Sequence, residues 1–289
     1  MHYHIGCSGW SYTSWQGPFY PSNIENSSWL KYYSHVFDYV EIDSSFYRIP
    51  NVFSVKNWYK KTPTNFKFTA KFPRVITHDK RLKEVDKELD HFFEAIGPLS
   101  DKTLALLIQL PPSLQIFEGL ERLRELVLGL DTRFRYAVEV RHSSWFQDLA
   151  YNFFANNDIC MAWSELAELR TPPIVTTDFL YLRFIGDRRI QEKDFGRIQI
   201  DRVIEMQKWA NDIKTVEDEG IKLAIIAANN HYAGFGPGTV NIFRNTLGLS
   251  EAKWEEKEEK EQQQQKHPSH DLKQRTLSDF LTDCLRFPD

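Results

Sequence analysis

Apolar and acidic residues alternate along one short stretch, Tyr39-Val40-Glu41-Ile42-Asp43. Side chains on a β-strand point alternately to its two faces, so Val40 and Ile42 are predicted on one face and Glu41 and Asp43 on the other. In a barrel wall the outer face packs beneath helices and the inner face can carry polar groups. The stretch therefore predicts a barrel strand whose acids point inward.

The chain up to about residue 248 repeats short β-rich runs that alternate with helical patterns. The predicted strands lie at residues 4–7, 39–43, 66–70, 104–110, 136–140, 159–163, 180–184 and 222–228. Helical spacing is clearest at residues 85–96, 120–130 and 203–213. Eight strands with helical connections in roughly 250 residues fit a (β/α)8 TIM-type barrel, an α/β fold, which we predict for residues 1–249. A doubly wound open sheet is the alternative, but no Gly-rich fingerprint follows the first strand.

Composition narrows the class of protein. A chain of 289 residues, 42% hydrophobic, can bury a sizeable core, and its formal net charge of -4 provides no general attraction to nucleic acid. The three cysteines, Cys7, Cys160 and Cys284, lie far apart and show no metal-ligand spacing, which fits a reducing compartment. No apolar stretch reaches about twenty residues. We therefore expect a cytoplasmic protein.

The composition changes abruptly after residue 249. Residues 253–261 are dominated by Glu and Lys, and four Gln follow them. Such a segment cannot bury enough apolar surface to offset its ordering entropy, so residues 250–272 are predicted to form a disordered linker.

A short amphipathic motif follows the predicted linker, within residues 273–289. Gln274 is followed by Leu277 and then by Phe280 and Leu281. This pattern resembles the box with which DNA-metabolising proteins bind the ring-shaped sliding clamp (PCNA) of archaea and eukaryotes. The resemblance implies that Leu277, Phe280 and Leu281 fill a hydrophobic pocket of the clamp while Gln274 caps a neighbouring polar one. Many such boxes have a second aromatic residue where this chain has Leu281.

Six phrases in the body of the chain carry a family resemblance. They are IGCSGWSY (5–12), VEIDSSFYR (40–48), FTAKFPR (68–74), QLPPS (109–113), AVEVRHSSWF (137–146) and NNHYAG (229–234). Together they resemble the YecE-like family, domain-of-unknown-function family 72. The resemblance implies a single TIM-type barrel and brings no activity, because the family's reaction is unassigned. Many relatives carry Asn where this chain has Asp43.

Charged and amide side chains gather at the predicted C-terminal ends of the strands. The alternation that places Glu41 and Asp43 inward does the same for the following residues: Lys71, Glu139, Arg141 and Arg183. Gln109, Asn229 and Asn230 end two further strands. TIM-barrel active sites are built at this end of the barrel, so the set predicts a pocket for a polar or anionic substrate.

We expect this set to divide into groups that do chemistry and groups that hold the substrate. Arginine offers bidentate contacts to phosphate or carboxylate, and a glutamate there can serve as general base or acid. His142 is a candidate proton shuttle, with a hydrogen-bonded structural histidine as the alternative. We assign catalytic roles to Glu41, Glu139, His142 and Lys71, and substrate-binding roles to Arg141, Arg183, Gln109, Asn229 and Asn230.

The same charges admit a structural alternative. Three carboxylates balance three cations, so a closed network of salt bridges would also satisfy them. Packing alone, however, would fill the barrel mouth with Val, Ile and Leu rather than six ions, which favours a binding site.

No cofactor and no metal site are predicted from these residues. Mg²⁺ held by Glu41, Asp43 or Glu139 is the alternative, whereas zinc is disfavoured because only His142 and His231 accompany the acids.

Three further segments could border the pocket. The basic stretch 71–83 could meet phosphates or form a solvated face. Aromatic residues at 10–20 could stack on a base or pack as a lid. The Gly-rich residues 234–238 could bring backbone amides to an anion.

The preferred functional hypothesis is an enzyme of hydrolase type, its reaction unassigned. It would act on a phosphorylated or nucleic-acid-derived substrate and be recruited to the sliding clamp in DNA replication or repair. Two alternatives stay open: a non-catalytic ligand-binding or adaptor barrel, and a sugar or small-molecule hydrolase or isomerase with an incidental tail motif. A glycosidase would need Glu41 and Glu139 about 5 to 10 Å apart across the cleft.

Overall fold

The structure, a computed structural model, describes residues 1–186 and 188–254. The predicted clamp-binding motif, with Gln274, Leu277, Phe280 and Leu281, lies outside the described residues, as does most of the predicted linker.

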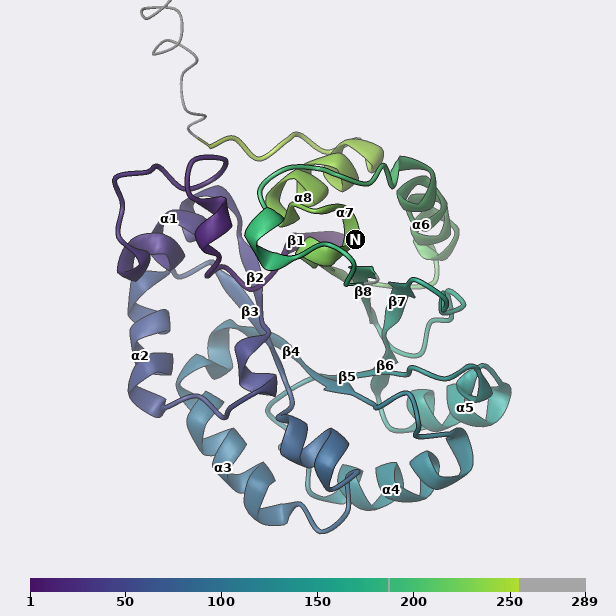
Figure 1. The fold of residues 1–289 in the computed structure, drawn as a ribbon. Coiled ribbons are helices and arrows are strands. Elements are labelled where there is room, and N and C mark those ends of the chain that lie inside the picture. Colours follow the sequence, from purple (N-terminus) through teal and green to yellow (C-terminus); the bar gives the residue numbers. More distant parts are fainter. Residues whose placement is uncertain (187, 255–289) are drawn as a thin grey trace, which may run out of the picture. The chain divides into compact units, whose positions relative to one another are not determined.

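Parallel strands make up the centre of the described part of the chain (Figure 1). They are β1 (His2–Ser8), β2 (Tyr39–Ile42), β3 (Lys67–Lys71), β4 (Thr103–Gln109), β5 (Tyr136–Glu139), β6 (Ile159–Met161), β7 (Trp163–Leu166), β8 (Phe179–Gly186) and β9 (Leu223–Ala228). Their order in the sheet is β6-β5-β4-β3-β2-β1-β9-β8-β7. Each predicted strand coincides with one of these elements, and the predicted strand at 159–163 covers two of them.

The sixth predicted strand is divided into β6 and β7, which are the two edge strands of the sheet. The edges approach each other at this point. β6 pairs with β5, and β7 pairs with β8, with Ala162 as the single residue between them. At the free edge of β6, the hydroxyl of Thr176 accepts from the Met161 amide at 2.8 Å and donates to the Ile159 carbonyl at 2.7 Å. The Thr176 side chain thus provides the hydrogen bonds that a neighbouring strand would otherwise make with β6. The sheet forms a nearly closed barrel. The predicted TIM-type α/β fold is confirmed.

Helices surround this barrel in Figure 1. They are α1 (Trp29–Val36), α2 (Val52–Lys61), α3 (Asp86–Ile96), α4 (Ile116–Leu128), α5 (Asp148–Asn156), α6 (Val203–Val216), α7 (Asn230–Ala233) and α8 (Gly236–Thr246). The three stretches with clear helical spacing correspond to α3, α4 and α6. Within the described part of the chain, no helix combines the length and apolar character needed to cross a membrane.

The alternation of side chains divides the apolar residues into two cores. Val40 and Ile42 belong to the large cluster that also contains the buried faces of the helices. Tyr39, Leu107 and Tyr181 belong to a separate, smaller cluster in the interior of the barrel. The predicted inward and outward faces of the strands are therefore confirmed, and the inward positions above this inner cluster are those that carry charge.

Residues 250–254, which we expected to begin the linker, contact the barrel. The Trp254 indole donates to the Pro18 carbonyl at 3.0 Å, and its ring lies 5.4 Å from that of Phe19, centroid to centroid. Asn241 and Ala252 exchange two hydrogen bonds of 2.9 Å. The packed part of the chain thus continues at least to Trp254.

Candidate functional site

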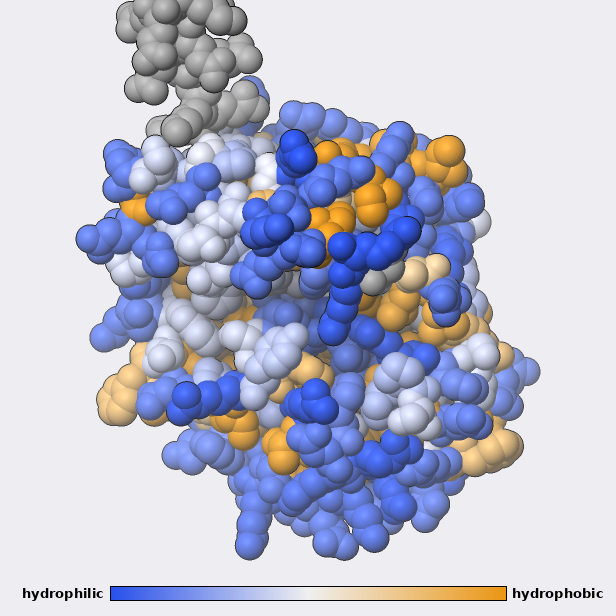
Figure 2. Space-filling model, in the orientation of Figure 1, coloured by the Kyte–Doolittle hydropathy of each residue, from blue (hydrophilic) through white to orange (hydrophobic). Residues whose placement is uncertain are grey.

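A cavity of about 780 Å³ opens at the C-terminal ends of the strands. Its wall comes from loops after most of the strands, including Tyr12 after β1, Asp43 after β2 and Asn229 after β9. On the face drawn in Figure 2 hydrophilic side chains predominate, and hydrophobic ones form small separate patches. The cavity lies where the sequence predicted the pocket.

The side chains that reach the cavity are mostly cationic. Among the described residues, the lining contains the cations Lys71, Arg74, Arg141, Arg183 and Arg188 and the acids Asp43 and Glu192. On the described part of this wall, cations outnumber acids five to two, and five to four when Glu41 and Glu139 beneath it are included, so the electrostatic potential in the cavity still favours an anionic ligand.

Arg183 forms the floor of the cavity. Its side chain is 2% exposed and makes a bidentate contact with Glu41, from Nε to Oε2 at 2.8 Å and from Nη2 to Oε1 at 2.6 Å. Its third nitrogen, Nη1, donates to Oε2 of Glu139. One guanidinium therefore joins residues of β2, β5 and β8.

Further hydrogen bonds extend this network around the barrel. Arg141 donates from Nε to Oε1 of Glu139 at 2.5 Å and from Nη2 to the Gln109 side-chain oxygen at 3.0 Å. Below Arg183, the Tyr181 hydroxyl donates to Oε2 of Glu41 at 2.6 Å. Residues of four strands, β2, β4, β5 and β8, are thus joined in one hydrogen-bonded network.

The buried carboxylate of Glu139 is held ionised by its partners. Burial opposes ionisation of Glu139, but the charges of Arg141 and Arg183 outweigh it and lower its pKa from 4.5 to about 2. Burial also opposes the charge on Arg183, yet Glu139 and Glu41 raise the pKa of its guanidinium well above the ordinary value. Neither glutamate has any exposed surface. Both therefore lie beneath the cavity rather than in it, which does not suit the predicted proton transfer with a substrate.

Lys71 and Asp43 form an ion pair that does face the cavity. Lys71 Nζ lies 2.6 Å from Oδ1 of Asp43, and the two side chains are 9% and 21% exposed. Burial raises the pKa of Asp43, but the charge and hydrogen bond of Lys71, with help from Arg183, outweigh this effect and leave the pKa below its ordinary value. Asp43 is therefore the open carboxylate of the predicted acidic set.

His78 lines the cavity and was not assigned a role from the sequence. It lies in the turn Val75–Asp79 after β3, where Nδ1 is 2.9 Å from the Thr77 hydroxyl oxygen. Burial, and then the positive charges of Arg74 and Arg141, lower the pKa of its imidazole. At neutral pH the ring is therefore uncharged and can accept a proton. His78 belongs to the basic stretch 71–83, which the sequence placed at the border of the pocket. Nothing in the sequence, however, favours His78 over His142 as a proton-transfer group.

His142 and Asn230 lie outside the cavity lining, unlike Gln109 and Asn229. Nδ1 of His142 accepts from the Ser144 amide at 3.1 Å and caps a short turn, as in the structural alternative. The Asn230 side-chain oxygen accepts from the Trp15 indole at 3.0 Å and from the Gly236 amide at 2.8 Å. These contacts hold loops in place. They also engage the Gly236 amide, one of the backbone amides with which the Gly-rich segment 234–238 was expected to bind an anion.

The basic stretch 71–83 and the aromatic residues at 10–20, the other two predicted borders of the pocket, each line the cavity only in part. Arg74 and His78 line the cavity, whereas Arg81 points to Glu118, 2.8 Å away. Trp10 and Tyr12 line the cavity, whereas the remaining aromatic residues of that segment are fully buried: Trp15, Phe19 and Tyr20.

The carboxylates considered for Mg²⁺ already have cationic partners. Glu41 and Glu139 face Arg183, and Asp43 faces Lys71. A magnesium ion at this end of the barrel stays a prediction, and it would compete with these ion pairs for its ligands.

A parallel barrel with a polar cavity at the C-terminal ends of its strands defines a protein of the TIM-barrel type. The family model described as protein of unknown function DUF72 matches residues 4–265. The chain therefore belongs to the DUF72 family, and the YecE-like resemblance of its sequence phrases is confirmed.

Several relatives support this assignment. The UPF0759 protein YecE of Escherichia coli K12 is 30% identical over 143 residues, which are 50% of this chain and 50% of the relative. The UPF0759 protein YunF of Bacillus subtilis is 30% identical over 115 residues, 38% of this chain and 40% of the relative. The chain thus spans about half the length, or less, of the curated relatives it matches.

Two solved structures have the same fold. A DUF72 family protein of Thermotoga maritima is 27% identical, with a TM-score of 0.71 over 86% of this chain and 100% of that one. Another, from Enterococcus faecalis, is 19% identical, with a TM-score of 0.70 over 86% of this chain and 96% of that one, and supports the fold alone.

The depressed pKa of Glu139 predicts a specific dependence of stability on pH. A carboxyl whose pKa falls on folding stabilises the protein above its unfolded pKa, and that contribution is lost as the pH drops from about 4.5 toward 2. We expect denaturant titrations to show a loss of roughly 3 kcal/mol over this range that is absent from Glu139→Gln. Glu121→Gln, on the exposed face of α4, is the control and should keep the wild-type slope. Parallel pH profiles for wild type and Glu139→Gln would contradict the assignment.

Proposed function

We propose that the barrel is an enzyme of hydrolase type that binds a phosphate-bearing substrate, of nucleotide or nucleic-acid origin, in the cavity at the C-terminal ends of its strands. The observation that carries this proposal is the excess of cationic side chains on the described lining of the cavity. Phosphate groups are anions that such a wall can hold, because Arg and Lys are the residues that bind them.

The cations of the site would have two roles: some would form the floor of the cavity, and others would contact the ligand. Arg183 and Arg141 are already bound to Glu41 and Glu139 and form a fixed, charge-paired floor. Arg74 and Lys71 also line the cavity. The Arg74 side chain is 59% exposed, and its ion pair with the exposed Asp79, 3.1 Å away, is open to water, so a phosphate could take the place of Asp79. In this arrangement Glu41 and Glu139 are positioning residues, because they orient the arginines and have no exposed atom of their own.

His78 is the proposed general base. Its lowered pKa leaves the imidazole uncharged at neutral pH, so it can take a proton from an attacking water molecule. Lys71, held by Asp43, would stabilise negative charge that develops on the phosphate. Trp10 and Tyr12 on the same wall offer ring faces to a base or sugar.

Two alternative functions make different demands on the same cavity. A non-catalytic ligand-binding barrel would use the same cationic wall, and measured turnover separates it from an enzyme. A retaining or inverting glycosidase needs two carboxylates that flank the sugar. Glu41 and Glu139 instead both contact Arg183 beneath the cavity, so the geometry favours a phosphate-bearing ligand.

Substitution of Arg74 tests the binding half of the proposal. We expect Arg74→Gln to weaken binding of nucleoside monophosphates, or of the best ligand in a panel that includes sugar phosphates, at least about tenfold in calorimetry. The melting temperature should stay near that of the wild type, because the side chain is exposed. Arg81→Gln is the matched control, since Arg81 belongs to the same basic stretch but pairs with Glu118 away from the cavity. Equal affinities for Arg74→Gln, Arg81→Gln and wild type would exclude Arg74 from the site.

Substitution of His78 tests the catalytic half. A screen of nucleotides, sugar phosphates and damaged DNA should reveal a hydrolysed substrate, and His78→Asn should then lower kcat about 10²- to 10⁴-fold with ligand binding retained. Because a base must be unprotonated, activity should decline only below the ordinary imidazole pKa of 6.5 as the pH is lowered. His142→Asn should keep near-wild-type turnover. Binding without turnover of any substrate in the screen would favour the ligand-binding alternative.

Recruitment to a sliding clamp is the remaining part of the proposal, and the sequence motif at 274–281 supports it. We expect a peptide spanning residues 273–286 to bind the sliding clamp of the same organism and Phe280→Ala to abolish this binding, because a buried aromatic anchor dominates small interfaces. Leu285→Ala, outside the motif, should bind like the parent peptide. Calorimetry with no detectable binding at high micromolar clamp would remove the DNA-metabolism hypothesis and leave the barrel's own function untouched.

A further inference from the structure

A second group of chemically reactive side chains lies at the N-terminal ends of the strands, away from the cavity. His2 and His4 are two residues apart on β1, so they lie on the same face of that strand. Asp38 immediately precedes β2, the neighbouring strand. His4 is 6% exposed, whereas His2 is exposed, so the group has a buried side and a side open to solvent.

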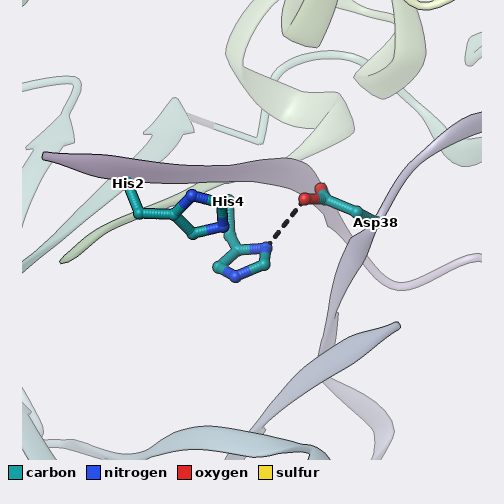
Figure 3. Close-up of side chains that lie close together, drawn as sticks. All are labelled: His2, His4 and Asp38. Atoms are coloured by element: carbon teal, nitrogen blue, oxygen red, sulfur yellow. Dashed lines mark hydrogen bonds and ion pairs between the residues drawn. The ribbon is translucent and has the colours of Figure 1, made fainter. Parts of the chain in front are cut away.

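The three side chains converge on one space. Nδ1 of His4 lies 2.9 Å from Oδ2 of Asp38, and the two imidazole rings meet edge to face with their centroids 4.7 Å apart. One ligand atom from each residue lies within 4.8 Å of the other two. Figure 3 shows a ring nitrogen of His2 and Nδ1 of His4 turned toward the same gap as the carboxylate of Asp38. In the described part of the chain this is the one group of three or more potential ligands with such spacing.

β1 and β2 are not paired with each other near His4, so a bound metal ion could connect them there. β1 pairs with β9 from His2 to Cys7, but with β2 only at Cys7 and Ser8. The first half of β1 therefore lacks backbone hydrogen bonds to β2 on the side where Asp38 lies. The hydrogen bond between His4 and Asp38 is a side-chain connection across this unpaired segment.

We propose that His2, His4 and Asp38 bind a zinc ion that fastens the start of β1 to the residue before β2. Two imidazole nitrogens and one carboxylate oxygen are a common donor set for zinc, whereas Mg²⁺ and Ca²⁺ prefer oxygen ligands alone. Tetrahedral zinc holds its ligand atoms about 3.4 Å apart, so closure needs a shift of roughly an ångström, which the exposed His2 side chain can make. On binding, Nδ1 of His4 turns from its contact with Asp38 to the metal and the ring proton resides on Nε2. Water takes the fourth position on the open side.

This site differs from the one that the sequence disfavoured. Zinc was disfavoured at the barrel mouth, where only His142 and His231 accompany the acids. The His-x-His spacing at the start of the first strand predicts no metal site by itself, and it becomes significant because Asp38 lies beside it in the folded chain.

Metal titration of the untagged chain of residues 1–289 tests the proposal. After treatment with a chelator, we expect the protein to bind one equivalent of Zn²⁺ with a micromolar or lower Kd, and zinc but not Mg²⁺ to raise the melting temperature. His2→Ala and Asp38→Asn should each weaken zinc binding at least about tenfold. His2 is exposed, so its variant keeps the fold. Cobalt titration should give visible absorption bands in the wild type that both variants lose.

Two control variants distinguish this site from other histidines. His35→Ala changes an exposed histidine of α1, and the double variant His267→Ala, His270→Ala removes the histidines of the C-terminal segment. Both should bind zinc as the wild type does. The proposal is overturned by a wild type that takes up no zinc at 100-fold excess over protein, or by zinc affinity that is unchanged in His2→Ala and Asp38→Asn. Anion binding at the cavity should be unaffected by His2→Ala, so the two sites fail or succeed separately.

Discussion

The guanidinium of Arg183 is the group on which the functional end of the barrel depends. It is almost fully buried and contacts both Glu41 and Glu139, so residues from three strands share one charge network. A buried ion is tolerated only when its hydrogen bonds are satisfied, and here each of the three side-chain nitrogens has a carboxylate oxygen as partner. The positions of Arg141 and Gln109 follow from this arrangement, since Arg141 bonds to both Glu139 and Gln109.

This network has a consequence for the chemistry of the cavity. Glu41 and Glu139 neutralise buried arginines and have no exposed surface, so they do not meet a substrate directly, and the pKa of Glu139 is lowered as well. The charged and titratable groups that line the cavity outside this network include Lys71 with Asp43, Arg74, His78, Arg188 and Glu192. Lys71, Arg74 and His78 come from β3 and the turn after it. In the proposed function, this charge-paired floor is fixed, and the exposed Arg74 and the Lys71–Asp43 pair are the groups that would meet the phosphate.

At both ends of the barrel, the arrangement of neighbouring strands brings together side chains that are far apart in the sequence. At the C-terminal end, charged side chains from several strands converge because the strands are parallel and end together. At the N-terminal end, His2, His4 and Asp38 converge because β1 and β2 are neighbours whose pairing starts late. In both places hydrogen bonds between strands fix side chains that are far apart in sequence, such as Glu41 and Arg183.

The sequence by itself determined the strands, their inner and outer faces and the end of the barrel at which charge gathers, because alternation in a strand is a local property that needs no knowledge of its neighbours. It also indicated Glu41, Lys71, Arg141 and Arg183 as members of one site. Only the tertiary structure decided which of these charges neutralise one another and which stay open, since pairing depends on distances between strands. For the same reason His78 and the group at His2 could not be singled out beforehand: their environment is made by Arg74, Arg141 and Asp38, whose positions only the folded barrel fixes.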